Sequence, residues 1–120
     1  MAKPGNTGIK RILNAFVFSW QGFKSAFKYE EAFQQETFVL LIAVPLALWL
    51  GDSGLEKALL IGSVLILMIV ELLNSGIEAV VDRVGDDWNE LAGRAKDIGS
   101  AAVLLATINA ILIWAFILFA

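Results

Sequence analysis

The sequence of 120 residues contains no cysteine and no histidine. Their absence excludes disulfide frameworks, thiol nucleophiles, zinc sites built from Cys and His, and imidazole acid–base catalysis. Polar surface is also scarce, because 58% of the residues are hydrophobic and the mean hydropathy is +0.74. A soluble chain of this length cannot bury so much apolar surface. We therefore expect one domain whose surface faces lipid or other subunits, and whose chemistry relies on carboxylates, Lys, Arg, hydroxyls and amides.

The first 28 positions lack acidic residues. They carry five Lys or Arg residues, for a charge of +5, whereas the remaining chain sums to −8. A secretory signal would instead place an apolar core of roughly 7–15 residues before a small-residue cleavage site. Because basic residues recur as far as Lys28, we expect no signal peptide here.

Three long stretches contain few charges: residues 37–51 and 98–120 carry none, and residues 58–81 carry two acids. A membrane-spanning helix needs ~20 mostly apolar residues, so these stretches predict membrane helices. Three buried helices of a soluble bundle are the alternative. The last stretch argues against that alternative, because its polar side chains are only Ser100, Thr107 and Asn109.

The sequence therefore predicts a single all-α membrane domain over residues 1–120. Its expected parts are a surface helix at 8–28, spans at 32–50, 57–84 and 97–119, and a cytoplasmic hairpin at 85–96. Pro45 predicts a kink in the first span, which neighbouring helices can tolerate in a membrane.

Residues 8–28 have the pattern of an amphipathic helix. Their apolar stripe consists of Ile9, Leu13, Phe16, Trp20, Phe23 and Phe27, at alternating steps of four and three. Basic and amide side chains follow one position later. We expect this helix to lie in the headgroup plane of an anionic leaflet. Phe18 falls outside the apolar stripe.

The distribution of basic residues near the span ends predicts the orientation. Five precede the first span and three lie in 82–97, whereas the turn at 51–57 has one. The positive-inside rule then places the amino terminus and the 82–97 loop in the cytoplasm, and the carboxy terminus on the other side.

Gly85 is expected to stop the second span. The segment Asp87-Trp88-Asn89-Glu90 fits a capping pattern for a new helical turn.

A polar stripe runs along the second span. It comprises Glu71, Asn74, Ser75, Glu78 and Asp82, which share about 100° of arc on a helix. Glu71 and Glu78 lie two turns apart, or ~10 Å along the axis. An acid at the centre of a span costs ~2.5–3.5 kcal/mol on insertion scales, so intramembrane acids indicate a functional site. The alternative is that these side chains join helices within an oligomer by hydrogen bonds.

A second acidic cluster, Glu30, Glu31 and Glu36, begins the first span. Glu30 or Glu31 should lie at the depth of Glu78. Hard oxygen ligands without His or Cys suit Mg²⁺ bound to a nucleotide phosphate, although a solvated charge pair at a helix start is the plainer reading for Glu31.

The mouth of the third span carries Arg94, Lys96 and Asp97 in the segment 93–100. Its cations could bind phosphates and Asp97 could orient them. Cations beside a span are also common membrane anchors, so this segment alone decides nothing.

The stretch Glu71-Leu72-Leu73-Asn74-Ser75-Gly76-Ile77-Glu78-Ala79-Val80-Val81-Asp82 is followed by Gly93-Arg94-Ala95-Lys96-Asp97 and preceded by Trp20 and Glu30-x-x-Phe33-x-Gln35-Glu36. Together these segments resemble the prokaryotic integral-membrane diacylglycerol kinase family over essentially the whole chain. The resemblance implies a bacterial inner-membrane kinase that moves the γ-phosphoryl group of MgATP to diacylglycerol and makes phosphatidate. It also implies a homotrimer with a surface helix and three membrane helices per subunit, with active sites shared between neighbours. No nucleic-acid partner is expected.

The resemblance further implies roles for individual residues. It makes Glu71 the general base with Asn74 beside it in the catalytic site, and it makes Glu30 and Glu78 the ligands of Mg²⁺. The implied nucleotide contacts are Arg11, Phe18, Glu30, Glu78, Asp87, Trp88, Asn89, Lys96 and Asp97. The implied contacts of the lipid substrate are Arg11, Ser19, Trp20, Glu36, Glu71, Ser100 and Trp114.

The chain departs from the family pattern at Gly76, where Ala or Ser is expected, and at Glu31, an additional acid beside Glu30.

Three other functions stay open at this point. A kinase of the same architecture could phosphorylate undecaprenol. A proton-coupled small transporter could use Glu71 as its proton carrier, and a structural or regulatory membrane subunit would need neither Glu71 nor Glu78 for function.

Overall fold

The computed structural model describes residues 5–85 and 89–120, and every regular element in these ranges is a helix. The helices are α1 (Gly8–Tyr29), α2 (Glu31–Leu50), α3 (Gly54–Arg83) and α4 (Glu90–Phe119). This arrangement confirms the all-α fold with one amphipathic helix and three long apolar helices. Residues 90–96, which the sequence assigned to a hairpin, form the first turns of α4.

Three helices are long and apolar enough to cross a membrane: α2, α3 and α4, with mean hydropathies of 1.5, 2.2 and 2.5 over their most apolar windows. Helices α3 and α4 each have 30 residues. Such a helix is ~45 Å long, whereas the hydrocarbon core of a bilayer is ~30 Å thick. One end of each helix therefore extends beyond the apolar layer. The charged ends, near Asp82 and Lys96, are the ones suited to do so.

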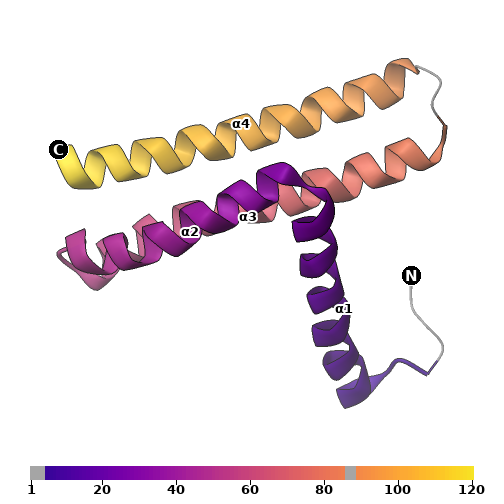
Figure 1. Ribbon diagram of the computed structural model, residues 1–120, viewed down its shortest axis with the longest axis horizontal. Helices are drawn as coiled ribbons and strands as arrows, with labels where there is room; N and C mark the ends of the chain where they lie inside the picture. Colours follow the sequence, from indigo (N-terminus) through magenta and orange to yellow (C-terminus); the bar gives the residue numbers. More distant parts are fainter. Residues whose placement is uncertain (1–4, 86–88) are drawn as a thin grey trace.

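Helix α3 is the centre of the bundle, because α2 packs on one part of it and α4 on another. Figure 1 shows α3 and α4 side by side and α1 leaving the bundle crosswise, with its main contact at α2. Most of the buried apolar side chains are small, and Phe33 and Leu60 are the larger ones. The small ones are Ala26 in α1, Ala43 and Ala47 in α2, Val64 in α3, and Ala106 and Ala110 in α4. Small residues let helix backbones approach closely, which is the usual way that membrane helices pack.

Helices α1 and α2 are joined by a single non-helical residue, Glu30, with φ −114° and ψ 106°. Its N–H donates to the Ala26 carbonyl (2.9 Å), and its carbonyl accepts from the Gln34 N–H (3.2 Å). The Gln34 side-chain amide also donates to the Phe27 carbonyl (2.6 Å). These bonds tie both helix ends to the joint, so the direction of α1 relative to α2 is well defined.

The other helix ends are capped by polar side chains. The Ser53 hydroxyl accepts from the Glu56 N–H (3.1 Å) at the start of α3. The Asn89 amide oxygen accepts from the N–H groups of Leu91 (2.9 Å) and Ala92 (3.2 Å) at the start of α4. The cap of α4 is thus Asn89, not the first residue of the expected Asp87–Glu90 pattern.

Helix α3 ends at Arg83, and the chain turns at Gly85, whose φ of 136° lies in a region that favours glycine. Helix α2 continues without interruption through Pro45. The expected stop at Gly85 therefore has a backbone reason, since a residue with a Cβ would be strained there.

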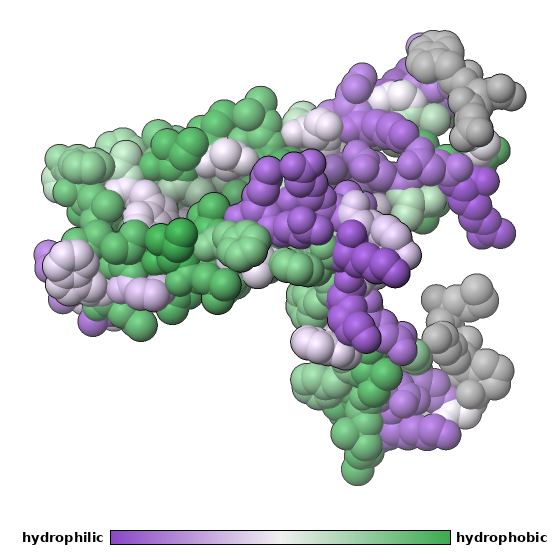
Figure 2. Space-filling model, in the orientation of Figure 1, coloured by the Kyte–Doolittle hydropathy of each residue, from purple (hydrophilic) through white to green (hydrophobic). Residues whose placement is uncertain are grey.

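Apolar side chains cover much of the surface. Figure 2 shows hydrophobic residues over one end of the bundle and along one side of α1, and hydrophilic residues gathered at the other end. Within α1, Ile9 is 77% exposed and Phe16 is 72% exposed. In water such exposure would be unfavourable by about 25 cal/mol for each Å² of apolar surface. A membrane removes that penalty, so the exposed residues agree with a membrane protein.

Candidate functional site

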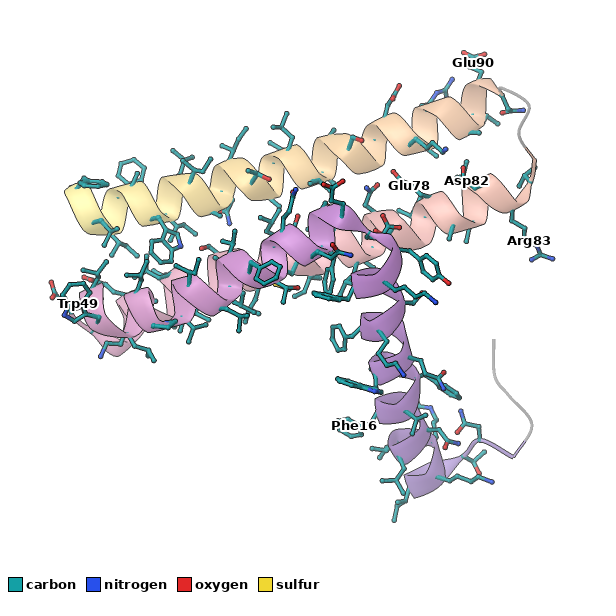
Figure 3. The ribbon with its side chains drawn as sticks, viewed as in Figure 1. Phe16, Trp49, Glu78, Asp82, Arg83 and Glu90 are labelled. Atoms are coloured by element: carbon teal, nitrogen blue, oxygen red, sulfur yellow. The ribbon has the colours of Figure 1, made fainter. Side chains whose placement is uncertain are left out.

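A cavity of about 700 Å³ lies between α1 and α3 at the polar end of the bundle. Three acids belong to its wall: Glu30 at the α1–α2 joint, and Glu78 and Asp82 one turn apart on α3 (Figure 3). Most of the remaining wall is made of small residues: Ser19, Gly22, Ser25 and Ala26 from α1, and Ser75, Gly76 and Ala79 from α3. The small side chains leave room for a ligand between the two helices.

The two residues expected to bind a metal, Glu30 and Glu78, therefore lie in the same cavity. Glu31 is exposed on the first turn of α2 and is not among the described residues that line this cavity. The difference between these neighbours arises because Glu30 is the non-helical joint and Glu31 already belongs to α2. Glu31 is therefore a weaker candidate than Glu30 for a metal ligand in this cavity.

The described residues contain no group of three or more Asp, Glu, His or Cys side chains that could hold a metal ion. The cavity instead offers two half-exposed carboxylates, Glu30 and Glu78. Mg²⁺ commonly binds through one or two carboxylates together with substrate phosphates and water. The donor set of the cavity therefore fits Mg²⁺ that arrives with a nucleotide.

A cation stands at the rim of the cavity. The Lys96 ammonium of α4 is 2.6 Å from Asp82 Oδ1, and Lys96 also lies near Glu78. The side chains of the pair remain 44% and 63% exposed, so Lys96 is accessible to a phosphate. Asp97, the next residue, is exposed. The segment 93–100 therefore meets the polar end of α3 through Lys96, although α4 contributes no residue to the cavity wall in the described part of the chain.

The polar stripe of α3 divides between two environments. Glu78, Asp82 and Ser75 line the cavity, whereas Glu71 and Asn74 are buried, with exposed fractions of 6% and 9%. The Glu71 carboxyl group faces that of Glu36 on α2. Asn74 points to α4, where its amide fills the space beside Gly99. The predicted base and its neighbour thus lie in the core of the bundle, next to the cavity and not in its wall.

Two buried oxygen atoms at this point have no hydrogen-bond partner among the described residues: Glu36 Oε1 and Asn74 Oδ1. A buried polar group without a partner is destabilising by ~1–3 kcal/mol. Unsatisfied groups of this kind are expected where a ligand or a water molecule supplies the missing donor. The carboxyl pair Glu36–Glu71 and the Asn74 amide therefore form a polar centre inside an otherwise apolar bundle.

A larger, apolar cavity of about 1070 Å³ lies among α1, α2 and α3. Trp20, Phe23 and Phe27 contribute its α1 side, and Leu65, Met68, Ile69 and Leu72 its α3 side. Lys24 and Lys28 also belong to the wall. The cavity has the composition that suits a lipid chain below a polar headgroup. Sequence reasoning missed its α3 residues, because apolar side chains that line a groove look the same as those that face lipid.

Several expected site residues are not brought to the α1–α3 cavity. Arg11 lies on the exposed first part of α1 and lines a separate cavity of about 440 Å³ together with Phe18 and Ser19. Because α1 is one helix, Arg11 is ~28 Å from Glu30 along its axis. Arg11 and Phe18 are therefore not among the described residues that line the cavity of Glu30 and Glu78. Ser19 borders both cavities.

Trp114 lies near the opposite end of α3. Its indole N–H donates to the Leu60 carbonyl (3.1 Å) and to Ser63 Oγ (3.2 Å). Leu60 is ~16 Å before Glu71 along the helix. Trp114 thus links α4 to α3 by hydrogen bonds, and its half-buried ring also lines an apolar cavity.

The structure also places two further expected residues, Ser100 and Asn89. Ser100 is exposed and follows the buried Gly99. Asn89 uses its amide oxygen to cap α4. Asp87 and Trp88, the other expected nucleotide contacts of this segment, lie outside the described residues.

Comparison with known proteins decides the family. A family model described as prokaryotic diacylglycerol kinase matches residues 17–118. The chain belongs to the prokaryotic diacylglycerol kinase family. This match covers α2, α3 and most of α1 and α4, so it includes every residue of the α1–α3 cavity.

Three diacylglycerol kinases from other bacteria match this chain over nearly their whole length. The diacylglycerol kinase of Escherichia coli (strain K12) is 52% identical over 112 residues, which are 93% of this chain and 92% of the relative. That of Haemophilus influenzae is 49% identical over 113 residues, or 94% and 96%. That of Pseudomonas aeruginosa is 47% identical over 114 residues, or 95% and 93%.

Membership of the diacylglycerol kinase family confirms the resemblance that rests on residues 71–82. The chain is a kinase, and a kinase uses a nucleotide as its phosphoryl donor and generally needs a divalent metal ion. With three helices that can cross a membrane, it is a membrane kinase. An enzyme of this kind is favoured over the proton-coupled transporter and the structural subunit.

Proposed function

We propose that this member of the diacylglycerol kinase family transfers the γ-phosphoryl group of MgATP directly to the free hydroxyl of diacylglycerol and releases phosphatidate and ADP. The observation that carries the proposal is that Glu30 and Glu78, from different elements, line one cavity, with Lys96 at its rim. Phosphoryl transfer mainly requires positioning and stabilisation of charge, and this set of residues supplies both.

The nucleotide phosphates would occupy the α1–α3 cavity. Glu30 and Glu78 would hold Mg²⁺ there, and the ion would neutralise charge on the phosphate oxygens. Lys96 can leave its exposed ion pair with Asp82 to meet a phosphate, because an exposed pair contributes only ~0–1 kcal/mol. Asp97 would orient that segment of α4. Asn89 would contact the nucleotide through its backbone, since its side chain caps α4.

The lipid would approach from the apolar α1–α2–α3 cavity, with Trp20 in its wall. The diacylglycerol hydroxyl oxygen attacks the γ-phosphorus, the bond from that phosphorus to the β-phosphate oxygen breaks, and the hydroxyl proton passes to the Glu71 carboxylate. Glu36 beside Glu71 and Ser100 beside Gly99 would orient the polar end of the lipid. The deeper position of Glu71 suits a lipid hydroxyl, and the shallower position of Glu78 suits a water-soluble nucleotide.

The proposed assembly is a homotrimer with shared active sites in a bacterial inner membrane. Because Arg11 and Phe18 lie far from Glu30 along their own helix, they would contribute to the site of a neighbouring subunit. The exposed apolar residues of the helices leave ample surface for such contacts. The amino terminus and the α3–α4 connection would face the cytoplasm, where ATP is present, and the carboxy terminus would face the opposite side.

The test is a transfer assay with purified protein in mixed micelles containing Mg²⁺ and γ-labelled ATP. Diacylglycerol and undecaprenol are supplied in parallel, and the labelled lipid is identified. We expect label in phosphatidate. Label only in the polyprenol would keep the mechanism and change the acceptor, and no label in either lipid from folded protein would contradict the proposed function.

A further inference from the structure

Gly99 of α4 differs from the helical glycines Gly22, Gly62 and Gly76 because the space beside it is already filled. A methyl group added to Gly99 would overlap the Asn74 amide oxygen of α3 and lie 3.1 Å from Asn74 Cγ. By contrast, a methyl group added to Gly62 or Gly76 would meet nothing within 4 Å. The Asn74 amide thus occupies the volume that any other residue at position 99 would need.

The contact is buried on both sides. Asn74 is only 9% exposed, and Gly99 is one of the buried residues of α4. Asn74 Oδ1 has no hydrogen-bond partner within the described part of the chain. The contact that the structure shows for this oxygen is its close fit against Gly99. This steric fit limits where the amide can lie.

The location of the contact connects both halves of the proposed site. Asn74 lies three residues after Glu71 and four before Glu78, so it is one turn from the proposed base and one turn from the proposed metal ligand. Gly99 lies in the turn of α4 that follows Lys96 and Asp97. Any change in the separation of α3 and α4 at this point moves Lys96 relative to Glu78.

We propose that Gly99 is a positioning residue for phosphoryl transfer. It lets the Asn74 amide lie flat between α3 and α4, level with Glu71 and Glu78, and it sets the helix separation that keeps Lys96 at the cavity. This inference rests on the proposed function, and it assigns to Gly99 a role that acts through Asn74. A side chain at position 99 must either rotate the amide away or push α4 outward.

The first test compares Gly99→Ala with wild type in the transfer assay. A displacement of ~1 Å in an active site can reduce the rate by about a hundredfold, so we expect kcat to fall at least tenfold. The KM for diacylglycerol should stay within about twofold, because the apolar cavity does not contain Gly99. The KM for ATP should rise as kcat falls, because Lys96 is displaced from the cavity that holds the phosphates. Gly62→Ala is the matched control, and it should leave kcat unchanged. A Gly99→Ala enzyme with wild-type kcat would overturn the proposal.

The second test asks whether the effect passes through Asn74. In the double variant Asn74→Ala/Gly99→Ala the clashing atoms are gone, and the nearest remaining atom, the Cβ of residue 74, lies at an ordinary contact distance of 3.9 Å. We expect Gly99→Ala to change kcat by less than about twofold in the Asn74→Ala background, since the coupling of a contacting pair appears as non-additivity. An equal loss in both backgrounds would show that Gly99 acts independently of Asn74 and would overturn the proposal.

Unfolding in detergent supplies a measurement that does not depend on activity. If Gly99→Ala is unfolded or strongly destabilised, the double variant should recover the wild-type unfolding midpoint, because the clash has been removed. Failure of the double variant to recover would contradict the role of Asn74. An inactive wild-type enzyme with folded Gly99→Ala and double variants would point to the proposed function, and not to Gly99, as the error.

Discussion

Glu30 is the single residue between α1 and α2, and its carboxyl group lies in the α1–α3 cavity with that of Glu78. Because Glu30 is the only residue between α1 and α2, its side chain lies where the two helices diverge. A carboxyl group at this place can bind a metal ion without being buried inside the bundle. The same geometry means that a movement of α1 would shift one ligand relative to the other.

Glu71 is buried beside Glu36 and lies outside the wall of the cavity that holds Glu30 and Glu78. We expect Glu71→Gln to reduce kcat by about 10²–10⁴-fold, the usual contribution of a general base. Binding of MgATP should persist, because the nucleotide cavity keeps its carboxylates. Equilibrium binding of labelled nucleotide, measured beside the transfer rate, separates the two effects. Loss of binding together with activity would contradict the role of Glu71.

Gly76 replaces a residue that the family pattern expects to be Ala or Ser, and a methyl group added there would meet nothing within 4 Å. Glycine inside a helix is destabilising by about 0.5–1 kcal/mol relative to alanine. We therefore expect Gly76→Ala to raise the free energy of unfolding in detergent by that amount and to retain activity. A lower unfolding midpoint would mean that a neighbouring subunit packs against Gly76.

At the scale of elements, α3 distributes the functional groups to three neighbours. Glu78 and Asp82 line the cavity beside α1, and Asp82 is also paired with Lys96 of α4. Glu71 faces α2, and Asn74 faces α4. The helix can do this because residues three or four positions apart lie on adjacent parts of its surface. A single central helix therefore sets the distances among all parts of the proposed site.

Much of this arrangement follows from the amino-acid sequence. A run of ~20 apolar residues allows few structures besides a membrane helix, so the helices of the bundle are predictable. The common depth of Glu30 and Glu78 is also predictable, and the structure brings both to one cavity. The division of the polar stripe was not predictable, because an arc on one helix does not reveal which neighbour faces each residue. Gly99 gave no signal, since its role depends on the amide of Asn74 in another helix.

The position of Trp114 could not be derived from its residue type, because a tryptophan in a span can face lipid or a neighbouring helix. Its indole N–H binds the Leu60 carbonyl and Ser63 Oγ in this structure. Hydrogen bonds between membrane helices contribute about 0.6 kcal/mol on average and up to ~1.7 kcal/mol.

We expect Trp114→Phe to lower the free energy of unfolding in detergent by about that average amount, because the ring is kept and the donor is lost. The KM for diacylglycerol should not change. Trp49→Phe is the control, since Trp49 is 78% exposed at the end of α2. An increase in KM for the lipid with unchanged stability would instead support Trp114 as a lipid contact.

In the molecule as a whole, one chain leaves much of its apolar surface uncovered. Helix α1 extends away from the bundle, and its apolar stripe is uncovered (Figures 1 and 2). The apolar stripe of α1 suits the membrane interface, with the helix axis in the headgroup plane. The residues at its beginning, including Arg11, are then available to another subunit.

A mixing experiment tests the shared site. If Arg11→Gln and Glu71→Gln each impair transfer, subunits of the two variants are exchanged in detergent at equal amounts. We expect the mixture to regain about one quarter of the wild-type rate, which is the chance that the two neighbours forming a site are each of the required kind. A mixture no more active than its parents, with exchange demonstrated by differently tagged subunits, would place each site within one chain.

The most direct test of the central claim, that phosphoryl transfer uses the cavity between α1 and α3, is a magnesium titration of the transfer rate in Glu30→Gln and Glu31→Gln. The two variants remove the same charge from adjacent positions, but only Glu30 belongs to the cavity wall among the described residues. We predict that Glu30→Gln needs at least about tenfold more Mg²⁺ for half-maximal rate, and that Glu31→Gln titrates as wild type. Equal titrations of Glu30→Gln and wild type, or a shift confined to Glu31→Gln, would contradict it.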